Sequence, residues 1–226
     1  MLRPCLIALA FIISNVVYSI NVNDLAKVDT FDFHDETVKK EIQTKEYFES
    51  ILQSNNKRKI AELFNKTAVY FANNNQPARS LSYFDLAYQL FQENRNFKEA
   101  NVVLNFKATV LYNMFQYEKA ISVFNQSIKQ RLLINDIKGI AETYEEVAFV
   151  YFNTYRLTQA RRYFAQSLSF YTDIKDTAGM AEANYYIGTI YLDEQNLDST
   201  LFFFNQSLQY DTKLKKKDDI ASSYNN

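Results

Sequence analysis

The sequence predicts an all-α protein, an α-solenoid of antiparallel helix pairs, from three observations. The first is an internal repeat with a period of forty residues, an interval typical of solenoids and other repeat arrays. The column that shows it best is Phe84, Phe124, Phe164 and Phe204. The second is the three-and-four spacing of apolar residues inside each copy, which marks one face of a helix. The third is composition, because only 3 glycines and 2 prolines occur in 226 residues.

The repeat divides most of the chain into four full copies. They run over residues 61–100, 101–140, 141–180 and 181–220. A column of small residues keeps the same period sixteen positions ahead of the Phe column: Ala68, Ala108, Ala148 and Gly188. We expect these small residues to let the Phe of the partner helix approach the backbone closely.

Each copy is expected to contain two helices joined by a short polar turn, a length that suits antiparallel neighbours. The turn of the third copy reads Asn153-Thr154-Tyr155-Arg156, and Pro77 opens a second helix, where a missing N–H costs nothing. One position near this turn recurs as Asn73, Asn113, Asn153 and Asp193. Because Asn tolerates left-handed backbone geometry, we expect these residues to cap helix ends, with a place on a binding surface as the alternative.

The segments that flank the four copies are expected to cover or continue the array. Residues 35–56 are predicted to form an N-terminal capping helix, since the outer face of a terminal repeat needs a cover. Residues 20–34 form a flexible lead-in to it. Residues 221–226 match 141–146 and indicate the start of a truncated fifth repeat. The chain is therefore expected to be a fragment of a longer protein, with a natural frayed end as the alternative.

Residues 1–19 have the pattern of a secretory signal peptide. Arg3 supplies a basic start, Cys5–Val17 is mostly apolar, and small residues precede a predicted cleavage after Ser19. The apolar stretch is shorter than the ~20 residues that span a bilayer. We expect a secreted or periplasmic protein, with an uncleaved N-terminal membrane anchor as the alternative. No other segment is apolar enough to insert into a membrane.

Two motifs in the third copy carry a resemblance to a known family. They are Tyr144-x2-Val147-Ala148-x2-Tyr151 and Ala160-x3-Phe164. At these residues the chain resembles the tetratricopeptide repeat family. Its period is forty rather than thirty-four residues and the family's closing Pro is absent, with Thr172 in its place. This longer repeat resembles the variant found in kinesin light chain-type and bacterial secreted or sensor arrays. The resemblance implies a right-handed tetratricopeptide superhelix that binds a protein or peptide.

The same resemblance places a second stripe of each first helix on a concave groove. In the middle copies this stripe combines aromatic residues with carboxylates, a composition expected of a binding surface. The candidate groove residues are Tyr112, Glu142, Glu145, Phe149, Phe152 and Tyr185. We expect the partner to be a protein or peptide segment of basic and apolar character. The alternative is that Phe149 and Phe152 are buried between neighbouring first helices.

The sequence holds few groups for catalysis, so no enzyme is expected. His34 is the only histidine, in an acidic stretch, and Cys5 is the only cysteine, which would leave with the signal. We therefore expect no catalytic residue, no metal site and no cofactor. The three glycines cannot build a phosphate-binding loop. A net charge of -1 offers no electrostatic case for nucleic acid.

Two functional interpretations remain from the sequence. The first is an exported scaffold, built of tetratricopeptide repeats, that binds a protein or peptide. The second is the extracytoplasmic sensory region of a larger signalling protein, whose output domain, a histidine kinase or a transcriptional regulator, lies beyond residue 226. An apolar stretch of about 20 residues downstream would favour the second.

Overall fold

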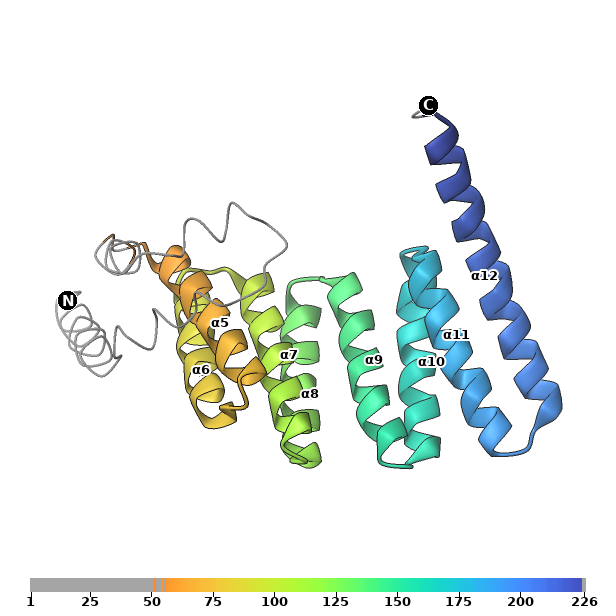
Figure 1. The fold of residues 1–226 in the computed structure, drawn as a ribbon, viewed down its shortest axis with the longest axis horizontal. Helices are drawn as coiled ribbons and strands as arrows, with labels where there is room; N and C mark the ends of the chain where they lie inside the picture. Colours follow the sequence, from red (N-terminus) through yellow and green to blue (C-terminus); the bar gives the residue numbers. More distant parts are fainter. Residues whose placement is uncertain (1–50, 52–53, 55, 225–226) are drawn as a thin grey trace. The chain divides into compact units, whose positions relative to one another are not determined.

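The computed structural model of the protein describes residues 51, 54 and 56–224, with side chains placed as far as Leu214. All regular secondary structure in these residues is helical, which confirms the predicted all-α solenoid of helix pairs (Figure 1). The expected signal peptide, the lead-in and nearly all of the expected capping helix lie outside the described residues. In the described part, no helix is long and apolar enough to cross a membrane.

The helices alternate between the first and the second member of each pair. The first helices are α5 (Lys57–Asn73), α7 (Phe97–Asn113), α9 (Ile137–Asn153) and α11 (Thr177–Asp193). The second helices are α6 (Pro77–Glu93), α8 (Tyr117–Leu133), α10 (Leu157–Asp173) and α12 (Leu197–Tyr224). All but α12 have 17 residues and are followed by a three-residue turn. The pairs therefore begin forty residues apart. Each pair begins four residues before the corresponding repeat copy that the sequence defined.

The described helices belong to two compact units, one ending at Asn96 and one beginning at Phe97. In the first unit α5 packs on α6, with Phe71 and Phe84 fully buried and the ring of Tyr83 stacked on Phe71. In the second unit each of the helices α7–α12 packs against the next along the chain. The candidate groove residues all lie in this second unit.

Every turn between helices in the described residues has the same backbone. Its second residue is left-handed, with φ between 54° and 60°: Asn75, Arg95, Phe115, Asn135, Tyr155, Lys175 and Gln195. The third residue then donates its N–H to the carbonyl five residues back, as Arg156 does to Tyr151 at 2.9 Å. This is the Schellman motif. The carbonyl of Arg156 also accepts from Ala160, so one residue ends a helix and begins the next.

The Asn column does not supply the left-handed residue, so that part of the prediction is wrong. Asn73, Asn113 and Asn153 are the last residues of their helices, two positions before the left-handed one. The helices run further than the predicted four-residue turn would allow. Each turn has only three residues: the C-cap of one helix, the left-handed residue and the N-cap of the next helix. As a result two left-handed positions hold bulky aromatic residues, Phe115 and Tyr155.

Small residues make room for large side chains at the helix contacts, as the sequence predicted. A Cβ at Gly188 would collide with the ring of Phe204. Gly139 and Gly179, forty residues apart, each face the long side chain at the end of the preceding second helix, Arg131 and Tyr171 respectively. Arg131 is buried and paired with Asp136. Glycine at these positions therefore sets how closely a second helix meets the first helix that follows.

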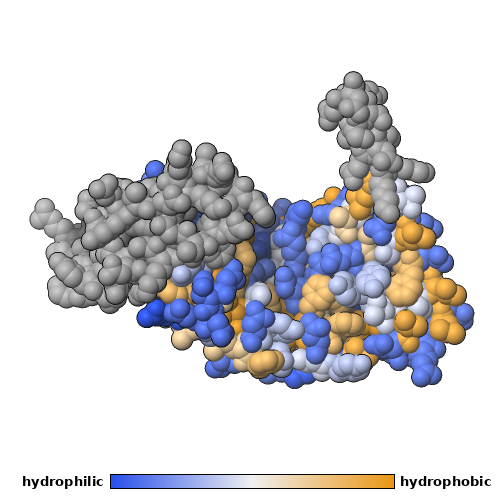
Figure 2. Space-filling view, viewed as in Figure 1, coloured by the Kyte–Doolittle hydropathy of each residue, from blue (hydrophilic) through white to orange (hydrophobic). Residues whose placement is uncertain are grey.

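The last helix differs from the others because it does not turn after 17 residues. α12 continues through residues 214–216, where the twenty-residue spacing of the turns would place the next one. The lysine run that begins at Lys213 therefore lies within α12. Leu201 and Leu208 are exposed, whereas their counterparts Ile121 and Ile128 are buried in α8, which has α9 packed against it. Apolar residues consequently reach the surface along α12 (Figure 2).

We predict that Gly179→Ala destabilises the second unit by about 1–3 kcal/mol, because the new methyl group would overlap the ring of Tyr171. The sign is informative, since alanine in a helix is otherwise about 1 kcal/mol better than glycine. Urea unfolding measures the change. The same substitution in a Tyr171→Ala background should cost much less, and an equal cost in both backgrounds would contradict the proposed overlap.

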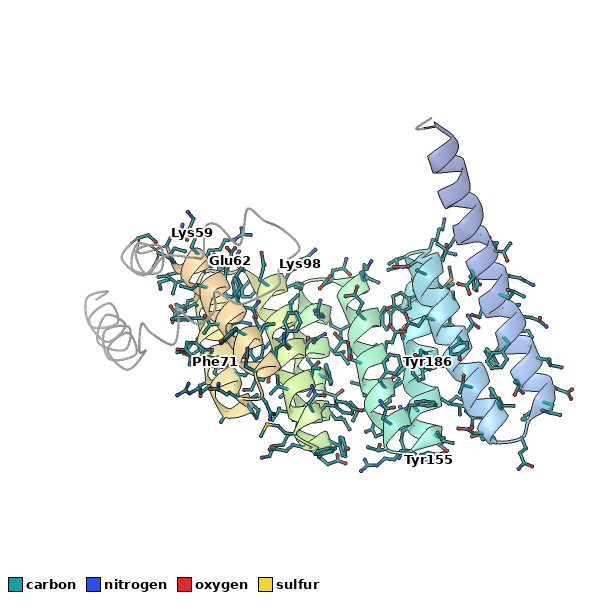
Figure 3. All side chains as sticks on the ribbon, viewed as in Figure 1. Lys59, Glu62, Phe71, Lys98, Tyr155 and Tyr186 are labelled. Atoms are coloured by element: carbon teal, nitrogen blue, oxygen red, sulfur yellow. The ribbon has the colours of Figure 1, made fainter. Side chains whose placement is uncertain are left out.

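We predict that Tyr155→Gly stabilises the protein by about 1 kcal/mol, since a non-glycine residue in the left-handed region costs roughly 1–2 kcal/mol. Tyr155 lies at the turn between α9 and α10 (Figure 3) and is 81% exposed, so little packing is lost. Asn135→Gly is the matched control and should gain less, because Asn adopts this backbone more easily. Thermal and urea unfolding compare the two. A loss of stability in Tyr155→Gly would show that its ring supports the turn.

Candidate peptide-binding face

A small pocket lies between the first helices α7 and α9. Its volume is about 120 Å³. It is lined by Thr109, Tyr112, Asn113, Phe124, Glu146, Phe149, Val150 and Asn153, which we call the aromatic pocket. Two of the six predicted groove residues, Tyr112 and Phe149, belong to it. Two residues of the Asn column, Asn113 and Asn153, belong to it as well.

Tyr112 forms one wall of the aromatic pocket from the last turn of α7. Its ring is half-buried and lies 5.6 Å from the ring of Tyr117, at the start of α8. Tyr117 in turn meets Phe115 edge-on at 6.2 Å. Tyr112 is therefore held by aromatic neighbours while part of its surface faces the pocket.

Phe149 and Phe152 are half-buried and join the core of the α9–α11 region. Phe149 meets the fully buried Phe164 edge-on at 5.2 Å and Tyr186 at 4.6 Å. Phe152 lies 5.9 Å from Tyr186. Tyr186, in the middle of α11 (Figure 3), stacks on Phe164. These are the contacts expected if the two rings lie between neighbouring first helices, although Phe149 also lines the aromatic pocket.

Tyr185 and Glu142 are the most open of the predicted residues. Tyr185 is 51% exposed and its ring stacks on that of Phe204 at 5.6 Å. Glu142 is exposed and lies 4.0 Å from Lys138, one turn earlier in α9. Lys138 is also 3.3 Å from Asp176, which is the tighter of its two pairs. Glu142 thus keeps most of its charge available to solvent or to a partner.

Glu145 is the buried member of the predicted set. Its side chain accepts a hydrogen bond from the hydroxyl of Tyr171 at 2.8 Å, while its other oxygen, Oε1, has no partner. Burial raises the pKa of Glu145 to about 7, with the hydrogen bond from Tyr171 acting in the opposite direction and the charges of nearby glutamates adding to the rise. Burial and the charge of Glu145 also raise the pKa of Tyr171. The phenol therefore stays a hydrogen-bond donor.

Four glutamates from two neighbouring first helices influence one another. We call Glu142, Glu145, Glu146 and Glu182 the carboxyl cluster. Burial raises the pKa of Glu146, and the charges of Glu142 and Glu182 add to the shift. In the part of the chain that the structure describes, no cation pairs with Glu145, Glu146 or Glu182. Within the described residues, the only cation near the cluster is thus Lys138, 4.0 Å from Glu142.

Four of the six predicted residues fall into two neighbouring groups joined by Glu146, and Phe152 and Tyr185 belong to neither. Tyr112 and Phe149 belong to the aromatic pocket, while Glu142 and Glu145 belong to the carboxyl cluster. Sequence reasoning missed Glu146, Tyr171 and Tyr186, and it placed Glu182 on the same stripe without naming it as a candidate. Glu146 and Glu182 had a signal, because they follow Glu142 by four and by forty residues. The role of Tyr171 had none, because the forty-residue column that contains it also holds Phe91, Arg131 and Asp211.

The described residues offer no arrangement of three or more His, Cys, Asp or Glu side chains that could hold a metal ion. The carboxyl cluster is therefore too spread out to act as a metal centre. Its chemistry is that of a surface that accepts hydrogen bonds and attracts positive charge.

Comparisons with known proteins agree on the fold. No protein-family model matches the chain, and no curated protein sequence matches it. Among solved structures, BtubC (BKLC) from P. vanneervenii is similar, with a TM-score of 0.66 and 12% identity over 90% of this chain and 87% of that one. A Rap conjugation gene regulator in complex with a peptide has a TM-score of 0.61 and 17% identity over 85% of this chain and 53% of its own.

A third similar structure carries the name of the repeat. It is a signal transduction ATPase from Pyrococcus horikoshii with a tetratricopeptide repeat sensor, at a TM-score of 0.62 and 16% identity over 74% of this chain and 27% of that one. This chain spans about half of the Rap regulator and a smaller part of the ATPase. At these identities the likeness is one of fold: the chain folds as an array of helix pairs like the one in tetratricopeptide repeat structures.

We predict that Glu145 makes stability depend on pH. In the native state its pKa is about 7, against 4.5 for an ordinary glutamate. Between these values the unfolded chain loses its proton and the native state keeps it, so stability present below pH 4.5 is lost as the pH rises through 7. Glu145→Gln should be more stable than the native protein by about 2 kcal/mol at pH 8 and equal to it near pH 4.5.

Urea unfolding at pH 4.5, 6 and 8 measures this difference. Asp211→Asn is the control, because Asp211 is exposed in α12. A Glu145→Gln protein that is less stable than the native one at pH 8 would show that the ionised carboxylate contributes to folding, contrary to this account.

Proposed function

We propose that the face formed by α7, α9 and α11 binds an extended or helical segment of another protein that carries Lys or Arg beside apolar residues. The single observation behind this proposal is the juxtaposition of the aromatic pocket with the carboxyl cluster, whose Glu146 and Glu182 pair with no cation of the described residues. Both are presented by consecutive first helices, and Glu146 belongs to both. The face therefore offers an apolar anchor and a negative charge side by side.

The size of the pocket favours a side chain over a free small molecule. Ligand pockets for drug-sized molecules usually enclose about 300–1,000 Å³. The aromatic pocket, at about 120 Å³, has room for one apolar side chain. Asn113 and Asn153 at its rim can hydrogen-bond a peptide backbone, since each amide carries both donors and acceptors.

Charge complementarity predicts the second feature of the partner, which is a positive charge. A patch of like charges attracts an oppositely charged partner and raises its association rate, and like-charged partners are repelled. Because Glu146 and Glu182 pair with no cation among the residues that the structure describes, a Lys or Arg of the partner can supply that pairing. An acidic peptide is disfavoured by the same charges.

The similar structures support a role in binding but do not identify the binding partner. The Rap conjugation gene regulator was solved in complex with a peptide, and the archaeal ATPase uses its repeats as a sensor. In this chain we propose a binding scaffold without enzymatic activity, with a forty-residue repeat akin to kinesin light chain-type arrays. The role of a sensory region in a larger signalling protein is the second candidate, and the sensor repeats of the ATPase favour it.

We further propose that the protein acts outside the cytoplasm. This rests on residues 1–19, with their basic start, short apolar stretch and small residues before the predicted cleavage site. An N-terminal anchor remains the alternative form of the same export. Release of residues 1–19 from the expressed protein, read by N-terminal sequencing of the exported fraction, separates the two.

We predict that a phage-displayed library of random dodecapeptides, selected on the immobilised protein, becomes enriched in Lys or Arg next to aromatic or aliphatic residues. Tyr112→Ala should weaken a selected peptide by about 1 kcal/mol or more, because it removes a wall of the aromatic pocket. Glu146→Lys should remove the preference for basic residues and slow association. Fluorescence anisotropy with the labelled peptide measures both effects.

The control variant is Asp211→Lys, which makes the same change of charge at an exposed position of α12, a helix outside the proposed face. Thermal melts of all variants separate loss of binding from loss of folding. Selection of acidic peptides, or equal binding by Glu146→Lys and Asp211→Lys, would contradict the proposal.

A further inference from the structure

The last described helix, α12, presents a stripe of apolar side chains to solvent. Leu197, Leu201, Phe204 and Leu208 follow one another at intervals of four, three and four residues, which keeps them on one face of the helix. We call these four residues the α12 stripe. The ring of Phe204 packs inward, against Gly188 of α11, while the three leucines are between 62% and 64% exposed.

The same positions of an earlier second helix are covered by its neighbour. Ile121, Phe124 and Ile128 of α8 are 6%, 1% and 4% exposed, and α9 packs against α8. The α12 stripe therefore has the residue types and the spacing of a helix contact surface, but it is exposed. A contiguous exposed apolar patch on a folded protein usually marks an interaction site.

The chain that follows α12 in the repeat register does not cover the stripe in this structure. Residues 217–224 correspond to 137–144, the beginning of α9, which follows a turn and packs on α8. In α12 the backbone instead stays helical through residues 214–216 and on to Tyr224 (Figure 1). Because a continuous helix cannot fold back on itself, the cover for the stripe must come from another molecule.

Charge is distributed unevenly along α12. Asp193 and Asp198 lie at its beginning, are exposed, and pair with no cation of the described residues. The lysine run begins at Lys213, five residues after Leu208. The apolar stripe is thus flanked by an acidic end and a basic end. Such a surface is complementary in charge to a reversed copy of itself.

We infer that the α12 stripe is a contact surface for a second copy of this chain, in which the two α12 helices pack antiparallel. A two-fold contact uses the same surface on both partners, so the lysine end of each copy meets the acidic end of the other. A parallel pair would instead set Asp198 against Asp198 and Lys213 against Lys213. Apolar residues at alternating intervals of four and three residues are also those that form the seam between paired helices.

This inference goes beyond the proposed function, because α12 does not belong to the face formed by α7, α9 and α11. Peptide binding and self-association can therefore be measured separately in the same variants. Leu208→Glu is expected to leave the affinity for a selected peptide unchanged.

Sedimentation velocity of the full chain over a series of concentrations tests the inference. We expect a reversible equilibrium between monomer and dimer with a Kd of about 1–100 μM, since a single helix pair lies at the low end of interface sizes. Leu208→Glu should raise this Kd at least about tenfold, because it places a charge in the apolar seam. The matched control is Leu133→Glu, at an exposed leucine of α8 outside the stripe, and it should leave the Kd unchanged.

Charge reversal tests the antiparallel arrangement. Asp198→Lys and Lys213→Glu should each raise the Kd by about two- to fivefold at low salt, since each sets like charges opposite one another. The double variant should recover the native Kd, because the two ends are again opposite in charge. In a parallel pair the double variant would still oppose like charges and would not recover.

Circular dichroism of each variant verifies that the helices remain folded. A dimer that is lost in Leu208→Glu but not in Leu133→Glu, and that recovers in the double charge variant, supports the inference. A chain that stays monomeric at every concentration, as it would if a different partner covers the stripe, overturns it. Equal effects of Leu208→Glu and Leu133→Glu overturn the assignment to the stripe, and failure of the double variant to recover overturns the antiparallel arrangement.

Discussion

The left-handed residue in each three-residue turn is the constraint on which the rest of the fold depends. It ends one helix and starts the next within three residues, and it recurs every twenty residues from Asn75 to Gln195. A fixed helix length of 17 residues follows, and so does the register of the packed faces. In the second unit this register brings Tyr112 of α7 opposite Glu146 and Phe149 of α9, which forms the aromatic pocket.

The forty-residue period made the helix pairs and the small-residue contacts predictable, because a contact between neighbouring copies repeats wherever the residues repeat. Gly188 against Phe204 is such a case. The left-handed positions were not predictable from residue type, since Phe115 and Tyr155 occupy two of them against ordinary preference. The bond from Tyr171 to Glu145 was not predictable either, because no other copy has this pair of residues.

The buried carboxyl of Glu145 connects folding to the proposed function. In the free protein its ionisation is opposed by burial and by three neighbouring glutamates, so the group weakens the fold near neutral pH. Such groups are common at functional sites, where stability is lower than packing alone would give. A bound cation beside the exposed carboxylates of Glu146 and Glu182 would relieve the repulsion inside the carboxyl cluster. Binding and local stability are then two aspects of the same interaction.

The most direct measurement of this account is the titration of the Glu145 side chain by carbon-13 NMR, with Glu145→Gln used to assign its carboxyl signal. The account predicts a midpoint near 7 in the free protein, because the carboxyl is buried among like charges. With a lysine-bearing peptide bound, the midpoint should fall toward the range of an ordinary glutamate. A midpoint near 4.5 in the free protein, or one that does not change when the peptide binds, would contradict it.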